Sequence, residues 1–433
     1  MMLRFALIIA VLVPFGARAA VEIQEVTSPG GITAWLVEEP SIPFVAMDIR
    51  FKGGSSLDPE GKRGATYMMM GLLEEGAGDR DARAFTEATE AVAANFGFDT
   101  FRDSVQIEAQ FLTENREESL ALLRDAIKFP RFDQDAIDRV QTQIVSIIEG
   151  NETDPNDIAG TTLAALSYPG HPYATGQEGT VESVNALTRA DLIAAHQAVF
   201  ARDRVYIGVT GDISAAELGP LLDTLLGDLP ATGAPMPVEA ELALEGGQTI
   251  VDYRSPQSVV LFGHAGVDRD DPDFFPAFVA NHILGGGGFE SRLMVNVRER
   301  RGLTYGISSF LASRDYGNQW LGQFSTSNEN VGPAIDLIQS IWDDMAENGV
   351  TPEELDAAQT YLTGAYPLRF DGNGRIAGIL AGMQAQGLGV DYIETRNDQV
   401  NAVTLEDIQR VAAEHLVVED MHFVIVGQPQ GFN

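Results

Sequence analysis

Arg298 and Tyr305 could act together on a peptide carbonyl group. Leu293, Met294 and Val297 fall on one helical face, Gly302 suits a helix C-cap, and residues 303–311 are typical of a strand. Arg298 would then lie in the last helical turn and Tyr305 near the strand's start. A guanidinium and a phenol there could donate hydrogen bonds to the oxyanion of a tetrahedral intermediate. The alternative is that both residues are structural. Arg298 would then be a cation that interacts favourably with the C-terminal end of the helix dipole, and Tyr305 a half-buried residue of the strand.

The histidines do not form a metal-binding motif. No two of the six lie three or four residues apart, so no helix would present two imidazoles on one face. Neither His-Glu-x-x-His nor its inverse, His-x-x-Glu-His, occurs. The chain also has no cysteine, which excludes disulfides, thiolate nucleophiles and Cys-based metal sites. We therefore predict no complete metal site in this chain. The six residues are His171, His196, His264, His282, His415 and His422.

Four consecutive glycines, residues 285–288, follow an apolar helix predicted over residues 274–284. They lack the Gly-x-x-x-x-Gly-Lys-Ser/Thr spacing of a phosphate loop, so we interpret them as a flexible helix stop.

The charge of the chain excludes the usual mode of nucleic-acid binding. Asp and Glu number 63 against 28 Lys and Arg, a formal net charge of −35, whereas phosphate binding needs clustered cations. If the wall of a substrate chamber shared this negative sign, basic unfolded peptides would be favoured as substrates.

The N-terminus is typical of a secretory signal peptide. Arg4 precedes an apolar run over residues 5–15, and a small-x-small site ends at Ala19. We expect cleavage after Ala19, a periplasmic or secreted protein, and no stable membrane span, because the apolar run is short for a permanent anchor.

The mature chain is an internal duplication. Residues 185–211 align without a gap to residues 401–427 at a constant offset, and each copy is typical of a Thr-capped helix followed by an apolar strand that ends at glycine. A Pro-rich stretch begins at Leu229. We predict a signal peptide over 1–19, homologous domains over 20–228 and 248–433, and a linker over 229–247. Strands mixed with long helices indicate an α+β fold, with helices packed on one face of each sheet.

Several local patterns together resemble the M16 family of metallopeptidases, which includes pitrilysin-like proteins and mitochondrial processing peptidase. They are residues 51–64 (FKGGSSLDPEGKRG), 169–173 (PGHPY), 211–213 (GDI) and 302–305 (GLTY). The resemblance implies two domains of the LuxS/MPP-like metallohydrolase fold, each with a mainly antiparallel sheet. It covers about residues 21–427.

The zinc motif of that family is degenerate in this chain. Active members carry His-x-x-Glu-His on the helix after the glycine that matches Gly64, with a distant glutamate as the third ligand. In that register Tyr67 and Gly71 replace the histidines and Met70 replaces the glutamate. None of them can hold zinc or accept a proton from water. Glu149 lies near the expected third-ligand position but cannot form a site alone.

The other catalytic element of the family is retained. The resemblance assigns Arg298 and Tyr305 to substrate-carbonyl binding and oxyanion stabilisation. Some bacterial members divide the work between two chains, so it implies a heterodimer in which a zinc-motif-bearing M16 partner holds the zinc and peptides are the substrates. By the same analogy, a peptide would pair with a sheet edge at Phe98, Asp99, Thr100, Phe101 and Arg102.

Two other functions stay open. One is a catalytically inactive structural or peptide-holding M16-like protein, for which the Arg298–Tyr305 spacing would have no use. The other is a peptidase active alone through an unrecognised site. Whether the partner is a different chain or a second copy stays open too.

Overall fold

The computed structural model describes residues 22–431. The predicted signal peptide and its cleavage point after Ala19 lie outside the described residues. Across the part of the chain that is described, no helix combines the length and the apolar character needed to cross a membrane.

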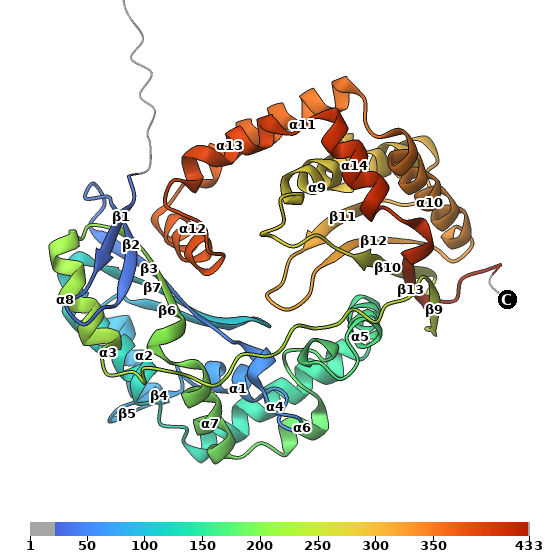
Figure 1. Ribbon diagram of the computed structural model, residues 1–433. Coiled ribbons are helices and arrows are strands. Elements are labelled where there is room, and N and C mark those ends of the chain that lie inside the picture. Colours follow the sequence, from blue (N-terminus) through green and yellow to red (C-terminus); the bar gives the residue numbers. More distant parts are fainter. Residues whose placement is uncertain (1–21, 432–433) are drawn as a thin grey trace, which may run out of the picture.

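The first half folds around a six-stranded sheet in the order β1-β2-β8-β3-β7-β6 (Figure 1). Its strands are β1 (Gln24–Thr27), β2 (Thr33–Glu38), β3 (Phe44–Lys52), β6 (Asn95–Thr100), β7 (Ser104–Leu112) and β8 (Val205–Gly211), and β4 (Gly76–Ala77) and β5 (Arg80–Asp81) form a separate small hairpin. Its helices are α1 (Ala65–Gly71), α2 (Ala82–Ala91), α3 (Arg116–Lys128), α4 (Gln134–Asn151), α5 (Pro155–Ser167), α6 (Val181–Asn185), α7 (Arg189–Val199) and α8 (Ala215–Leu226).

The second half repeats this topology with five strands, in the order β11-β12-β10-β13-β9. The strands are β9 (Gly247–Asp252), β10 (Gln257–Ala265), β11 (Ile307–Ala312), β12 (Gln319–Ser327) and β13 (His422–Gly427). The helices are α9 (Phe274–Asn281), α10 (Val331–Asn348), α11 (Pro352–Ala365), α12 (Asn373–Ala385), α13 (Tyr392–Ala402) and α14 (Leu405–His415). Each sheet has one parallel pair, β2 with β8 and β9 with β13, and is otherwise antiparallel.

The duplication seen in the sequence is present in three dimensions. Helix α7 and strand β8 correspond to helix α14 and strand β13. Both helices begin with the same capping box, Thr188 with Asp191 and Thr404 with Asp407. Between the halves, residues 227–246 contain neither helix nor strand, and this segment includes most of the predicted linker.

Alternation along the central strands separates two faces of each sheet. In β3, the side chains of Val45, Met47, Ile49 and Phe51 pack into the core beneath the helices of the first half. Ala46, Asp48 and Arg50 point to the opposite face. Helices of the same half therefore cover only one face, as the fold class predicts.

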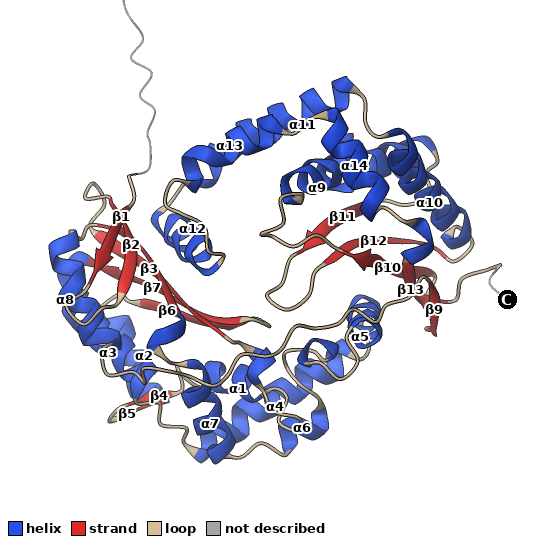
Figure 2. Ribbon diagram, viewed as in Figure 1, coloured by secondary structure: helices blue, strands red, loops and turns tan. Residues whose placement is uncertain are grey.

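The opposite face of each sheet bears a helix from the other half, which the sequence analysis did not predict. Helix α12 packs on β8, β3 and β2, and helix α5 packs on β10 and β13. Figure 1 shows the red-orange α12 beside the blue and green strands of the first sheet, and Figure 2 shows α5 beside β10 and β13 of the second sheet. Leu380 and Met383 of α12 are buried against Trp35, and Ala159 and Leu163 of α5 against Val424. The halves thus exchange helices.

Candidate functional site

Helix α1 carries the positions of the degenerate zinc motif, and Asp58 anchors its start. The carboxylate of Asp58 accepts hydrogen bonds from the Gly64 amide (2.9 Å), the Thr66 amide (3.0 Å) and the Thr66 hydroxyl (2.6 Å). Gly64 has φ 91°, and a Cβ there would lie 2.2 Å from the Glu178 carbonyl oxygen. Only glycine fits this turn, so the helix start is fixed although its motif is lost.

The side chains at the three motif positions do not fit a zinc ion. Met70 is 1% exposed and packs in the core. Tyr67 is half-buried; burial raises the pKa of its phenol, and the charges of Glu178 and Asp99 raise it further. Gly71 offers no side chain, and Glu149 is exposed on α4. This helix provides neither imidazole nor carboxylate where the family's chemistry needs them.

One group within residues 22–431 brings three potential metal ligands together, and it lies elsewhere. Asp273, Glu414 and His415 could direct one ligand atom each to a common point. However, Arg410 already donates to both carboxylate oxygens of Asp273, at 2.5 and 2.6 Å. The ion pair with Arg410 compensates the charge of the Asp273 carboxylate, so the position of this side chain does not require a metal ion.

The glycine run ends a helix and lets it approach an edge strand. Helix α9 continues as a π-helical turn, His282–Gly286. A Cβ on Gly285 would lie 2.4 Å from the Ser309 hydroxyl and 2.6 Å from its amide nitrogen in β11. The predicted helix stop is confirmed, and close packing on β11 is a second reason for glycine here.

Arg298 and Tyr305 lie side by side at the junction that follows. Arg298 is in a π-helical segment, Met294–Arg300, and its Nε donates to the Tyr305 carbonyl oxygen at 3.0 Å. The guanidinium carbon is 4.8 Å from the Phe289 ring centroid. The Tyr305 side chain is 89% exposed. Arg298 is therefore held by Nε and by stacking, and neither Nη group has a hydrogen-bond partner among the described residues.

Tyr305 lies in a turn, so the prediction of a strand from residue 303 is wrong. The strand β11 begins at Ile307 because two features hold the preceding residues in a turn. Gly302 has φ 61°, and the Leu303 amide donates to the Val297 carbonyl (2.9 Å), which closes the predicted C-cap. The Thr304 hydroxyl then lies 2.7 Å from the Ser325 carbonyl oxygen. This turn presents the Tyr305 side chain to solvent.

Two cavities meet at Tyr305. One, of about 900 Å³, extends along β11 past Asn281, Gly285 and Phe289. The other, of about 490 Å³, lies between Arg298, Thr304 and Ser327. Tyr305 lines both cavities, and Arg298 lines the smaller one. Sequence reasoning missed Thr304 and Asn281, because their roles depend on contacts with β12 and β11.

Residues 98–100 form the end of the edge strand β6. Phe101 and Arg102 follow it, and their carbonyl oxygens already accept hydrogen bonds from the Ser55 (2.9 Å) and Ser56 (2.8 Å) amides. β6 pairs only with β7 among the described strands, so its other edge is open. Asp99 and Phe101 are exposed, Phe98 is half-buried and Thr100 is buried. Arg102 has a structural role: its guanidinium donates to the carbonyl oxygens of Tyr173 (3.0 Å) and Thr175 (2.7 Å).

Comparison with known proteins gives consistent matches along the chain. Residues 34–180 match the family described as "Insulinase (Peptidase family M16)", and residues 186–362 match "Peptidase M16 inactive domain". The "Non-peptidase homolog YmxG" of Helicobacter pylori is 26% identical over 430 residues, 98% of both chains. The "Probable mitochondrial-processing peptidase subunit beta" of Schizosaccharomyces pombe is 24% identical over 432 residues, 96% of this chain and 94% of that one.

A solved structure shares the fold. The crystal structure of a peptidase M16 inactive domain from Pseudomonas fluorescens superposes with a TM-score of 0.88 at 29% sequence identity, and the match covers 94% of this chain and 98% of that one.

Proposed function

Because the chain belongs to the M16 peptidase family, we propose that it is a peptide-holding member that hydrolyses nothing alone and completes the active site of a zinc-bearing partner. Peptides are the substrates in this proposal, and zinc is held by the partner chain. The chain itself is exported to the periplasm or secreted after cleavage near Ala19.

The absence of hydrolysis by the chain alone is supported by the side chains of α1. A buried methionine, a half-buried tyrosine and a glycine occupy the motif positions. These groups can neither bind zinc nor activate water. The similarity to a protein named a non-peptidase homologue supports the same conclusion.

The contribution to a partner is supported by one observation, the Arg298–Tyr305 pair. Arg298 and Tyr305 are joined by a hydrogen bond from the guanidinium to the Tyr305 main chain, both line one cavity, and neither is part of the core. Fixed donors of this kind stabilise an oxyanion even when the nucleophile comes from another chain. Phe98, Asp99 and Thr100, at the open edge of β6, would pair with the main chain of the same peptide, whereas the carbonyl oxygens of Phe101 and Arg102 are already bonded to the Ser55 and Ser56 amides.

A peptide-holding protein with no catalytic contribution is the second candidate. The inactive-domain structure and the non-peptidase relative favour it. In that case the Tyr305 hydroxyl has no catalytic use.

Reconstitution with a His-x-x-Glu-His chain of the same family from the same cell separates the two candidates. The mature chain alone should contain no stoichiometric zinc and cleave no fluorogenic peptide, whereas the mixture should cleave it. Tyr305→Phe should lower kcat by about 100-fold, the effect of losing one oxyanion donor. Arg298→Ala should lower it at least as much.

Matched controls are available on the same half. Tyr361 is 63% exposed on α11, and Arg301 is exposed beside Arg298, so Tyr361→Phe and Arg301→Ala should leave kcat unchanged. Full activity of the mixture with both Arg298 and Tyr305 substituted would leave only the peptide-holding candidate. Mass spectrometry of the exported protein tests whether the mature chain begins at Ala20.

A further inference from the structure

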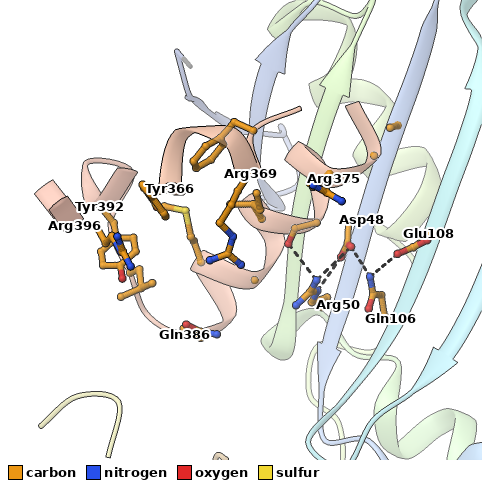
Figure 3. A pocket seen from close by; sticks show the side chains of 18 of the residues that line it. Asp48, Arg50, Gln106, Glu108, Tyr366, Arg369, Arg375, Gln386, Tyr392 and Arg396 are labelled. Atoms are coloured by element: carbon orange, nitrogen blue, oxygen red, sulfur yellow. Dashed lines mark hydrogen bonds and ion pairs between the residues drawn. The ribbon is translucent and has the colours of Figure 1, made fainter. Parts of the chain in front are cut away.

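A cavity of about 720 Å³ lies away from the Arg298–Tyr305 junction, between the two halves of the chain. One wall is the face of the first sheet formed by β3 and β7. The other wall comes from the second half: α9, α12, α13 and residues 366–370. Figure 3 shows the sheet residues and the helix residues facing each other across this space.

The wall of this cavity has the opposite sign to the chain. Five arginines and two carboxylates line it, although acidic residues outnumber basic ones by 63 to 28 in the whole sequence. The condition under which basic peptides would be favoured, a negative wall, is therefore not met in this cavity. The lining arginines are Arg50, Arg269, Arg369, Arg375 and Arg396, and the carboxylates are Asp48 and Glu108.

On the sheet side, Arg50 forms an ion pair with Asp48, and the neutral Gln106 amide joins Asp48 to Glu108. The Arg50 Nε donates to Asp48 at 2.9 Å, and the Gln106 amide donates to Asp48 at 2.6 Å and to Glu108 at 3.0 Å (Figure 3). Asp48 is 2% exposed, so solvent does not reach the centre of this hydrogen-bond network. The Asp48 carboxylate is thus neutralised by Arg50, whereas Glu108 is exposed and accepts one hydrogen bond from a neutral amide.

On the helix side, Arg396 is a buried cation without a carboxylate. Its side chain donates to the Leu362 carbonyl (2.8 Å) and the Asn397 amide oxygen (3.1 Å), and its guanidinium carbon lies 4.6 Å from the Tyr366 ring centroid. Arg396 is only 6% exposed. Burial lowers its pKa, and the like charge of Arg369 lowers it further. An uncompensated buried cation is costly unless an anion approaches it.

The other three arginines extend this positive wall toward the opening. Arg269 donates to the Tyr392 hydroxyl at 2.7 Å and stacks on Phe274, with 4.1 Å between guanidinium carbon and ring centroid. Arg369 and Arg375 are exposed, and neither has an ion pair or side-chain hydrogen bond within residues 22–431. Four guanidinium groups, two of them stacked on aromatic rings, therefore line a space in which Glu108 is the one lining carboxylate without a cationic partner among the described residues.

We propose that this cavity binds a carboxylate group of a peptide. A guanidinium offers two parallel N–H donors that match the two oxygens of a carboxylate, and the rings of Phe274, Phe278 and Tyr366 provide apolar surface for the attached stem. The carboxylate is a Glu or Asp side chain or the C-terminal group. That its carrier is a peptide rests on the proposed function, whereas carboxylate binding does not.

This cavity and the Tyr305 cavity are lined by residues of one helical segment, so their separation can be compared with the length of a short peptide. Phe275 lines the carboxylate cavity and Gly285 lines the Tyr305 cavity. These residues belong to one continuous helical segment, so they are about 15 Å apart along its axis at about 1.5 Å per residue. An extended peptide covers that distance with about five residues, so a peptide of about ten residues is a sufficient probe.

Direct binding to the mature full-length chain tests the proposal at constant ionic strength. The first peptide carries one Glu with both ends blocked, the second has Gln in its place, and the third has Gln and a free C-terminal carboxylate. At least one carboxylate peptide should bind about tenfold more tightly than the blocked Gln peptide, and the better one identifies the source. Citrate probes carboxylate binding without a peptide and should raise the melting temperature.

The variant Arg369→Gln/Arg375→Gln should abolish both effects, and its substituted side chains are exposed, so folding is spared. Arg83 and Arg254 are exposed and absent from the cavity wall, so Arg83→Gln/Arg254→Gln removes the same charge and should keep both effects. Equal binding of all three peptides, or a preference that survives in the Arg369/Arg375 variant, overturns the proposal. A citrate effect without binding of any peptide supports the cavity and overturns peptide holding instead.

Discussion

Replacing Gly208 by alanine should loosen the docking of α12 on the first sheet. Gly208 lies in β8 beneath α12, and a Cβ there would lie 2.0 Å from the Ala377 carbonyl oxygen and 2.9 Å from the Ala381 amide nitrogen. Ordinary contact begins near 3.4 Å, so the helix must move by about 1.4 Å. Both neighbours are backbone atoms, and no side-chain rotation can relieve the clash.

Two responses to the clash differ in free energy. Lifting α12 costs about 1–3 kcal/mol in strained packing, and the loss of the 2.8 Å hydrogen bond from Gln384 to the Ile207 carbonyl adds about 1 kcal/mol. Releasing the helix would expose Leu380, Met383 and Trp35, at about 2 kcal/mol each, or about 6 kcal/mol together. Lifting is cheaper, so Gly208→Ala should lower the free energy of unfolding by about 3 kcal/mol.

Urea unfolding of the full chain, followed by circular dichroism and tryptophan fluorescence, measures this loss. Trp35 packs against α12, whereas Trp320 and Trp342 are buried in the second half. A red shift in the tryptophan emission of the folded variant would therefore indicate that Trp35 has become exposed to water. Gly160→Ala in α5 is the control: no atom lies within 4 Å of a Cβ there, and alanine should stabilise that helix by about 0.5–1 kcal/mol. A Gly208→Ala chain within about 0.5 kcal/mol of wild type, with unshifted emission, refutes the reasoning.

Three further predictions concern single groups. Burial raises the pKa of Asp58 from 3.8 to about 6, so its stabilising contribution is full below pH 3.8 and lost as pH rises through 6. Wild type should therefore lose about 2 kcal/mol relative to Asp58→Asn between pH 4 and pH 7 in paired urea titrations; a pH-independent difference contradicts this. Tyr173→Phe removes a hydroxyl that donates to Asp103 (2.7 Å) and accepts from the Tyr316 amide (3.1 Å), so it should cost about 1–3 kcal/mol in thermal unfolding, and an unchanged transition would count against this bridge. Thr304→Val should lower kcat of the reconstituted enzyme more than it raises KM, because the freed turn misplaces Tyr305; unchanged kcat would show that the hydroxyl does not hold the turn.

Local signals in the sequence predicted the parts of the fold that local interactions determine. The Thr–Asp capping boxes and the constant offset between residues 185–211 and 401–427 revealed the duplication. Gly302 was correctly predicted as a C-cap because its left-handed conformation depends on the adjacent helix end. The strand β11 was predicted to begin at residue 303, but it begins at Ile307. The turn before it depends on the hydrogen bond from the Thr304 hydroxyl to the Ser325 carbonyl oxygen in β12, which is distant in the sequence.

Features assembled from distant residues were not predictable in this way. The carboxylate cavity joins β3 near Arg50 to α13 near Arg396, and no spacing in the sequence relates them. The one local trace of the exchange is the spacing of Gly374, Gly378 and Gly382 on α12, where a Cβ would approach Gln110, Asp48 or Arg50 within about 3.1 Å. Glycines four apart on a helix indicate close packing but not the partner.

The exchange of α5 and α12 also determines which parts can move as rigid bodies. If the chamber opens, α12 must travel with the first sheet and α5 with the second, because Leu380 is fully buried in one contact and Leu163 is 3% exposed in the other. The moving bodies are therefore not the two sequence halves. Hinges fall at the ends of the two exchanged helices as well as in residues 227–246. A chain cut within that segment would yield two fragments that stay associated, because α5 of the first fragment packs on the sheet of the second and α12 of the second packs on the sheet of the first.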